Sequence, residues 1–203
     1  MQITSRDIEI KTFLEKGFIA DTKVLNDLYF HHLTICQRRL TKLSRGDFIK
    51  RYRKYPQESY VYYTKETPTN IEKELMKTKI VAQFKNSSLK ILDYYSNYDL
   101  VRLTFDILII AETPNQKTVA LLFIVRNTGE VRKKRLEEAF KNKDECRLMF
   151  NQLKELAPIN SLMMVVCAPK PIDTMAFKYH YIDSEHIEEH TKQLIQQLEN
   201  ETL

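Results

Sequence analysis

The sequence predicts an α+β fold in two domains, and three observations support this prediction. Three short helical segments followed by two basic, β-prone runs account for residues 1–66. A turn-rich segment, residues 67–70, separates them from the rest of the chain. Residues 70–203 then follow the order helix, three strands, helix, strand, which is typical of a small α/β domain.

Capping residues and helical periodicity define the three N-terminal helices. The first helix begins near Thr4, where Thr4 and Asp7 fit a capping box, and it ends at Gly17. Asp21 is placed to cap the second helix, and the third helix covers residues 33–44. Each segment carries apolar residues at helical spacing, so each is expected to bury one face.

Two β-prone runs, Asp47–Lys54 and Ser59–Lys65, follow these helices and are joined by a turn that contains Pro56. Three short helices followed by a basic hairpin are the outline of a winged helix-turn-helix, whose third helix enters the major groove of DNA. The sequence therefore predicts a DNA-binding domain of this type over residues 1–66.

The net positive charge of the chain lies in its first third. The whole chain has a net charge of +5, and residues 1–65 have 13 Lys and Arg against 7 Asp and Glu. The remaining residues have 19 basic against 20 acidic side chains. Between Thr34 and Lys54 eight residues are basic and one, Asp47, is acidic. A basic block in an otherwise neutral chain indicates a surface that faces a polyanion.

The third predicted helix separates apolar from hydrogen-bonding side chains. Leu33, Leu40 and Leu43 fall within about 60° of Cys36 and form the expected buried stripe. The opposite face has only hydrogen-bond donors, of which Arg and Gln suit base edges and Lys and Thr suit phosphates. Together with the hairpin, the predicted DNA contacts are Thr34, Gln37, Arg38, Thr41, Lys42, Arg45, Lys50, Arg51, Arg53 and Lys54. The alternative is a solvated helix and a strand edge that Lys and Arg protect from aggregation.

Two short motifs, T-S-R-D at residues 4–7 and R-R-L-T-K-L at residues 38–43, carry a family resemblance. They resemble the opening of replication-relaxation proteins, which are winged-helix proteins of mobile elements linked to plasmid replication and conjugative DNA processing. The resemblance covers about residues 4–65. It implies a DNA-binding protein that works beside a relaxase or a replication protein.

The second domain has the element order of the restriction-endonuclease-like core, a module that the resemblance also implies. Such a nuclease holds Mg²⁺ with an acid on the second strand and an acidic group on the third. Asp106 suits the first position, but Phe123 and Val125 occupy the places of the others. We therefore predict a catalytically degenerate domain without a metal, in which Asp106 pairs with a base such as Arg102 or Arg126.

Four further elements are predicted in this domain: a helix over Gly129–Leu156, strands over Ser161–Ala168 and Met175–Ile182, and a last helix over Ser184–Glu199. The last helix contains H-I-E-E-H at residues 186–190, which matches a zinc-peptidase string. Only 13 residues follow it, too few for the segment that should supply a third ligand, so a solvated polar face is expected.

The leading prediction is a sequence-specific, non-enzymatic DNA-binding protein that acts by occupancy. It would be a transcriptional regulator, or an accessory factor in plasmid replication or conjugative transfer, without a cofactor. A homodimer is expected because one winged helix makes few base contacts. Three scattered cysteines and no apolar run near membrane length predict a cytoplasmic protein. The alternatives are a divergent metal-dependent nuclease guided by the winged helix and a protein-binding adaptor.

Overall fold

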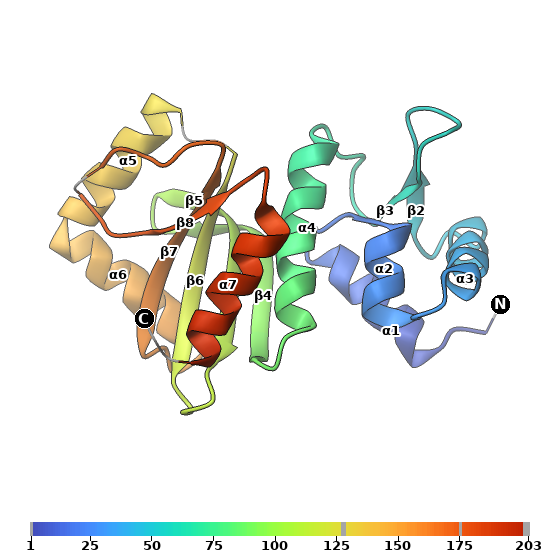
Figure 1. Ribbon diagram of the computed structural model, residues 1–203, viewed down its shortest axis with the longest axis horizontal. Coiled ribbons are helices and arrows are strands. Elements are labelled where there is room, and N and C mark those ends of the chain that lie inside the picture. The colour runs from blue at the N-terminus through green and yellow to red at the C-terminus, as the bar shows by residue number, and fades with distance from the viewer. Residues whose placement is uncertain (1, 127–128, 175, 201–203) are drawn as a thin grey trace. The chain divides into compact units, whose positions relative to one another are not determined.

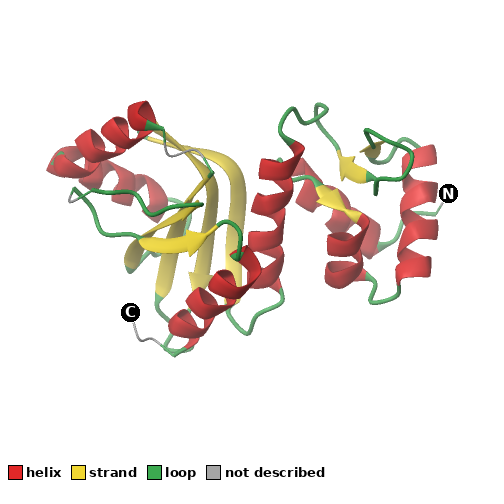
Figure 2. Cartoon of the chain, turned by 45° about the horizontal axis from the view of Figure 1, so that its top comes forward, coloured by secondary structure: helices red, strands yellow, loops and turns green. Residues whose placement is uncertain are grey.

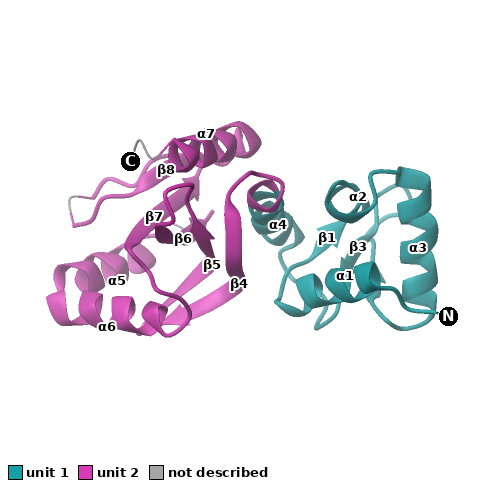
Figure 3. Ribbon diagram, turned by 90° about the horizontal axis from the view of Figure 1, so that it is seen from below, with its two compact units in different colours: residues 1–82 teal, residues 83–203 magenta. Residues whose placement is uncertain are grey.

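A computed structural model describes residues 2–126, 129–174 and 176–200 (Figure 1). It confirms a mixed α+β chain, which within these ranges has seven helices and two β-sheets (Figure 2). None of these seven helices has the length and apolar content that a bilayer crossing requires. The chain divides into two compact units, residues 1–82 and 83–203 (Figure 3).

The first unit combines helices with a small antiparallel sheet. Its elements are α1 (Ser5–Glu15), β1 (Ala20–Asp21), α2 (Thr22–Tyr29), α3 (Leu33–Arg45), β2 (Lys50–Tyr52), β3 (Val61–Tyr63) and the first part of α4 (Ile71–Lys85). The strands lie in the order β1-β3-β2, so β3 is central. The sequence indicates the β2–β3 hairpin, although both strands are shorter than predicted, and it does not indicate β1.

The predicted caps of α1 and α2 are confirmed. Thr4 accepts a hydrogen bond from Asp7 N at 3.4 Å, and the Asp7 carboxylate accepts one from Thr4 N at 2.7 Å, which completes the capping box. Asp21 accepts from Val24 N at 2.8 Å. Both helices therefore begin where the local sequence satisfies their first free N–H groups.

The apolar face of α3 begins one turn later than predicted. Cys36, Leu40 and Leu43 are fully buried, as expected. Leu33, which the periodicity places in the same stripe, is 52% exposed, and its neighbour Ile35 is 55% exposed. Leu33 is the first residue of α3. Helical spacing indicates the face on which a side chain lies, but it does not indicate whether another element covers that end of the helix.

The boundary between the units lies inside α4 and not at the linker that precedes it. Ile71 and Leu75 pack against a cluster that contains Ile19, in the first unit. The Thr78 hydroxyl also donates a hydrogen bond to the Ile19 carbonyl oxygen. The first turns of α4 therefore belong with residues 1–66, and the prediction of a second domain that starts at residue 70 is corrected.

The second unit is built on a five-stranded mixed sheet. Its elements are β4 (Lys90–Leu100), β5 (Leu103–Glu112), β6 (Thr118–Val125), α5 (Glu130–Lys141), α6 (Lys143–Lys154), β7 (Ser161–Ala168), β8 (His180–Asp183) and α7 (Ile187–Glu199). The strand order is β4-β5-β6-β7-β8, antiparallel as far as β6 and parallel from β6 to β8. β8 overlaps the strand predicted over Met175–Ile182, of which Met175 lies outside the described residues.

The long helix predicted over Gly129–Leu156 is two helices. Asn142 leaves the helical conformation between α5 and α6, and its side chain accepts from Asp144 N at 3.0 Å and Glu145 N at 3.3 Å. Asn is a strong N-cap residue, so this side chain stabilises a new helix start. The continuous apolar spacing predicts one helix, and the cap at Asn142 is the local signal that divides it into two.

The sheet of the second unit is covered on both faces. α5 and α6 lie on one face and α7 on the other (Figures 1 and 3). On the first face Leu122 and Ile124 pack in one cluster with Leu136 of α5 and Met149 of α6. All eight residues of β6 are buried, and each Leu, Ile, Val or Phe among them contributes roughly 1.5–3 kcal/mol by leaving water.

Candidate nucleic-acid interface

The outer face of α3 is open to solvent and carries no acid. Of the predicted contacts on this helix, Thr34, Gln37, Arg38, Lys42 and Arg45 are exposed and Thr41 is half-buried. α3 contains no Asp or Glu. Within the described part of the chain, no carboxylate forms an ion pair with Arg38, Lys42 or Arg45. These three cations can therefore bind an anion without breaking an internal pair.

Arg39 lies beside Arg38 in the sequence but has a different environment. Its Nε donates to Asp7 Oδ1 at 2.8 Å, and its NH2 group pairs with Asp7 Oδ2 and donates to the Gln2 carbonyl oxygen at 2.7 Å. Asp7 is fully buried and also accepts from the Thr4 hydroxyl at 2.7 Å. Arg39 therefore fixes α3 to the start of α1 and is absent from the predicted contact set for a structural reason.

The Asp7 carboxylate is held in its charged form. Burial raises the pKa of Asp7, but hydrogen bonds from Arg39 and Thr4 outweigh burial and lower it from 3.8 to about 2. Asp7 belongs to the T-S-R-D motif and Arg39 to the R-R-L-T-K-L motif. The two motifs that carry the family resemblance are thus joined by one ion pair.

Strand alternation divides the basic residues of the β2–β3 hairpin between two faces. Lys50 lies on the face of Tyr52 and Tyr63, which pack with Ile19, and its ammonium donates to the Lys65 carbonyl oxygen at 2.9 Å. The structure thus separates Lys50 from the other predicted contacts of the hairpin. The alternation of side chains along a strand indicates, from the sequence alone, that Lys50 and Arg51 lie on opposite faces.

Arg51 and Arg53 lie on the other face of the hairpin, with Tyr60 and Tyr62. Arg51 pairs with Tyr62 across the strands. Tyr62 is buried, and its ring is tilted against that of Tyr60, with ring centroids 6.4 Å apart. Burial raises the pKa of Tyr62. Cys36 of α3 donates its thiol at 3.7 Å to the carbonyl oxygen of Thr22, which directly follows β1, the strand that pairs with β3.

Both arginines of this face contact one aromatic ring. The guanidinium carbons of Arg51 and Arg53 lie 4.4 Å and 4.6 Å from the centroid of the Tyr60 ring, within the range of cation–π interaction. Arg53 also donates to the Pro56 carbonyl oxygen at 2.8 Å, and Lys54 lies 5.2 Å from the Tyr55 ring. Arg53 and Lys54 are exposed. The hairpin therefore presents three cations, each of which lies beside a tyrosine ring.

An open hollow of about 570 Å³ lies at the C-terminal end of α3. It is lined by Gln2, Thr4, Arg39, Lys42, Arg45 and Gly46. Arg39 is already neutralised by Asp7, whereas Lys42 and Arg45 keep their charges available. The structure thus brings two of the predicted contacts to the rim of one positively charged hollow.

In the second unit, Asp106 is buried and engaged. Its Oδ2 accepts from Val125 N at 2.8 Å and lies 3.1 Å from a guanidinium nitrogen of Arg132 on α5. Arg132 also donates to the Thr104 carbonyl oxygen at 2.8 Å. Asp106 thus forms an ion pair, as predicted, but with Arg132, a partner that the sequence analysis did not name. Arg102 lies instead 3.8 Å from Glu145.

The surroundings of Asp106 lack the other groups of a metal-dependent nuclease. Phe123 and Val125 are fully buried, and Phe123 meets the ring of Phe84 edge-on at 6.0 Å. Among the described residues, no group of three or more His, Cys, Asp and Glu is placed to hold a metal ion. A single carboxylate bound by an arginine cannot position a divalent cation and a water together.

The histidines of the H-I-E-E-H string contact Asp183. His186 Nδ1 lies 3.2 Å from Asp183 Oδ2, and His190 Nδ1 accepts from Asp183 N at 3.0 Å. The backbone N–H of Glu185 and the His186 ring lower the pKa of Asp183. The two histidines therefore stabilise the turn between β8 and α7, and the exposure of His186, Glu188 and Glu189 agrees with the solvated polar face that the sequence predicts.

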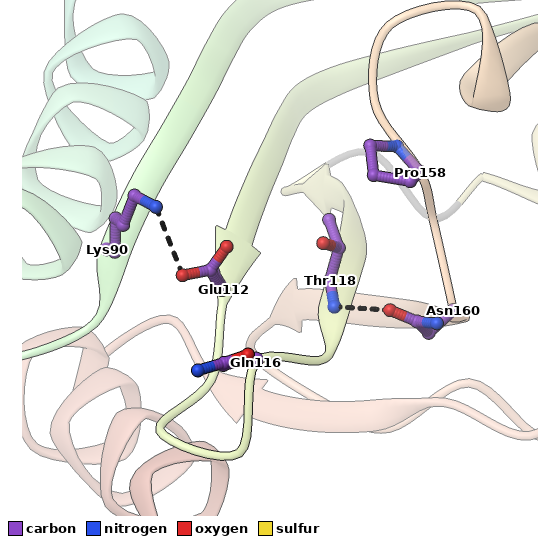
Figure 4. A pocket seen from close by; sticks show the side chains of 6 residues that line it. All are labelled: Lys90, Glu112, Gln116, Thr118, Pro158 and Asn160. Atoms are coloured by element: carbon purple, nitrogen blue, oxygen red, sulfur yellow. Dashed lines mark hydrogen bonds and ion pairs between the residues drawn. The ribbon is translucent and has the colours of Figure 1, made fainter.

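A second open hollow, of about 560 Å³, lies at one end of the sheet (Figure 4). It is lined by Lys90, Glu112, Gln116, Thr118, Pro158 and Asn160. Lys90 pairs with Glu112 at 3.1 Å, and Asn160 Oδ1 accepts from Thr118 N at 2.7 Å. Its principal charged and polar groups thus bind one another, and the hollow offers no uncompensated charge to a ligand.

Comparisons with known proteins give no family for this chain. No protein-family model matches it, and no curated protein matches it. A solved structure that it resembles is that of a repair endonuclease from Pyrococcus abyssi, with 14% sequence identity and a TM-score of 0.27. The match covers 68% of this chain and 48% of the endonuclease, so this chain spans about half the length of that protein. A likeness this low carries no conclusion about fold or activity, and the resemblance to replication-relaxation proteins stays a prediction.

Proposed function

We propose that the first unit is a winged helix-turn-helix that binds double-stranded DNA. In this proposal α2 and α3 with the turn between them form the helix-turn-helix, and β2 and β3 with their loop form the wing. α3 enters the major groove, and the wing lies along the flanking backbone. The observation that carries the proposal is the outer face of α3, which is exposed, cationic and free of acids.

The chemistry of this face suits a duplex. Arg38 and Gln37 have the side chains that bind guanine and adenine edges in the major groove. Lys42 and Arg45 border the hollow at the end of the helix, where they can bind phosphates. A helix that reads bases at its centre and binds backbone at its end gives both specificity and register.

The proposed action is occupancy without catalysis. The protein would be a transcriptional regulator, or an accessory factor in plasmid replication or conjugative transfer in the cytoplasm. The second unit would dimerise or recruit a partner such as a relaxase or a replication protein. Val131 of α5 and Leu148 of α6 are 68% and 56% exposed, and exposed apolar side chains on neighbouring helices support a contact surface there.

A direct binding measurement tests the proposal. Fluorescence anisotropy would compare a labelled duplex from the region upstream of the gene with a scrambled duplex of equal length. Binding is expected to weaken with salt, with a slope of log K on log salt of about −4.5 for roughly five phosphate contacts. A purified protein that ignores both duplexes at low salt would refute the proposal.

The two alternatives predict different results. A nuclease guided by the winged helix would nick plasmid DNA with Mg²⁺ or Mn²⁺ and lose this activity in Asp106→Ala. The ion pair between Asp106 and Arg132 argues against that outcome. A protein-binding adaptor would keep its partner when the charges of Arg38 and Arg45 are reversed, whereas a DNA reader would lose its duplex.

A further inference from the structure

The strongest unexplained feature of the first unit is the ring of Tyr60, which two cations share. The guanidinium carbons of Arg51 and Arg53 both lie within 4.6 Å of its centroid. Solvated arginines at alternate positions of a strand repel each other and sample many rotamers, so their meeting at one ring needs a cause. The negative face of an aromatic ring supplies it.

Tyr60 is itself held in place by the hairpin. Its ring lies 6.4 Å from that of Tyr62, which is 2% exposed and pairs with Arg51 across the strands. The hydrogen bond from Arg53 to the Pro56 carbonyl oxygen ties the same group to the loop. The buried Tyr62 thus supports the half-buried Tyr60, which supports two guanidinium groups.

Stacking on a ring leaves the useful part of an arginine free. A guanidinium that lies over an aromatic ring keeps its N–H edge directed outward, and this edge is the part that binds phosphate oxygens. Arg51 has no hydrogen-bond partner within the described part of the chain. Arg53 uses one N–H group on Pro56. Most donors of the pair are therefore available.

We infer that Tyr60 is a positioning residue that holds Arg51 and Arg53 as one preformed clamp for DNA phosphates beside α3. This inference rests on the proposed function and adds the part of the duplex that the wing binds. The sheet that includes this hairpin lies beside α3, because Cys36 of α3 donates its thiol to the carbonyl oxygen of Thr22, which directly follows β1, and β1 pairs with β3. Preformed side chains lose less rotamer entropy on binding, so the ring increases affinity without touching DNA.

Five proteins test the inference in the same anisotropy assay. They are Tyr60→Ala, Tyr60→Phe, the double variant Arg51→Ala/Arg53→Ala, the triple variant that adds Tyr60→Ala, and Lys50→Ala. Tyr60→Ala is expected to weaken binding roughly 5- to 10-fold and to reduce the salt slope by about one to two. Tyr60→Phe keeps the ring and should stay within about twofold of wild type.

The remaining variants separate positioning from other roles. In the triple variant, loss of Tyr60 should cost nothing further, because the ring acts only through the two arginines. Lys50→Ala removes one charge from the opposite face of the same strand and should change affinity less than twofold, roughly as expected for a screened, distant charge. The preference for specific over scrambled DNA should persist in Tyr60→Ala, because phosphate contacts carry no sequence information.

Each other result overturns the inference. The positioning role is refuted if Tyr60→Ala binds DNA with wild-type affinity. It is also refuted if Tyr60→Ala weakens binding equally when Arg51 and Arg53 have already been replaced by alanine. A loss in Tyr60→Phe as large as in Tyr60→Ala assigns the effect to the hydroxyl. If thermal unfolding shows that Tyr60→Ala does not fold, Tyr60→Leu keeps the bulk and removes the ring. A wild-type protein that binds no duplex refutes the proposed function as well, whereas binding that depends on the arginines but not on Tyr60 refutes the inference alone.

Discussion

Cationic side chains have different surroundings in the two units. In the second unit, Lys90, Arg102 and Arg132 lie 3.1, 3.8 and 3.1 Å from carboxylates of the same unit. On the outer face of α3 in the first unit, Arg38 and Arg45 form no such pair with any described residue. These three cations of the second unit therefore belong to internal ion pairs, whereas Arg38 and Arg45 stay exposed and unpaired among the described residues.

The contrast also exists between two adjacent residues of α3. Arg39 binds the buried Asp7, whereas Arg38 points into solvent. An exposed charge contributes little to the free energy of folding, but a charge that satisfies a buried carboxylate contributes a great deal. We therefore expect two classes of arginine: those whose substitution weakens DNA binding, and those whose substitution lowers the free energy of unfolding.

The largest expected effect is on DNA affinity. Reversing two charges, in Arg38→Glu/Arg45→Glu, should weaken duplex binding roughly 1,000-fold at low salt, since like charges placed against phosphates each cost several kcal/mol. Lys170→Glu/Lys178→Glu is the matched control, because it changes the net charge equally at exposed positions of the second unit. Anisotropy titrations measure the affinity of both variants. An equal loss in the control would show that the net charge of the protein, and not the position of Arg38 and Arg45, determines DNA affinity.

Removing the partner of the buried carboxylate should have the next largest effect. Arg39→Ala leaves Asp7 charged and fully buried, so it should lower the free energy of unfolding by about 3 kcal/mol. Arg38→Ala, at the next position, should change stability by less than about 0.5 kcal/mol. Urea unfolding followed by circular dichroism measures both. Equal stabilities for the two variants would contradict the structural role of Arg39.

Local signals in the sequence predict much of the fold but not these long-range pairs. The capping box at Thr4, the cap at Asp21 and the buried stripe of α3 follow from residues within four positions of one another. Arg39 and Asp7 are 32 residues apart, and nothing in the spacing of either indicates the other. Composition therefore counts Arg39 in the basic block, and although it is not among the predicted contacts, nothing in the sequence names Asp7 as its partner.

The same limit applies to the second unit and to the hairpin. The sequence predicts that Asp106 binds a base, but only the packing of α5 on the sheet selects Arg132. Tyr60 directly precedes β3 and belongs to no motif in the sequence. Its contact with two arginines depends on the register of β2 and β3. Residues that act through tertiary contacts are the ones that pattern analysis misses.

Acid should remove the stabilisation that Asp7 provides. The pKa of Asp7 is about 2 in the folded protein, below its ordinary value of 3.8, so the contribution is complete above about pH 5 and is lost as the pH falls through 2. The whole shift corresponds to about 2.5 kcal/mol. Because Asp7 is still half charged at pH 2, the difference in unfolding free energy between wild type and Asp7→Asn should shrink by about 2 kcal/mol from pH 6 to pH 2. A difference independent of pH would contradict the shifted pKa.

The variant Asp106→Asn tests whether the second unit contributes to DNA binding. It removes the ion pair with Arg132 and keeps an oxygen that can accept from Val125 N, so a loss of about 2 kcal/mol in stability is expected. DNA affinity should stay within about twofold of wild type, because the substitution lies outside the first unit. A large loss of affinity in this variant would show that the compensated charges of the second unit also serve the duplex.

The smallest expected effect is at the tip of the wing. Lys54 is exposed and lies 5.2 Å from the Tyr55 ring, beyond the clamp formed by Arg51 and Arg53. Lys54→Ala should weaken binding to specific and scrambled duplexes alike, by about 1 kcal/mol, and reduce the salt slope by about one. Titrations between about 50 and 200 mM salt measure the slope. A loss confined to the specific duplex would instead assign Lys54 to base contacts, and the division between a reading helix and a backbone-binding wing would then be wrong.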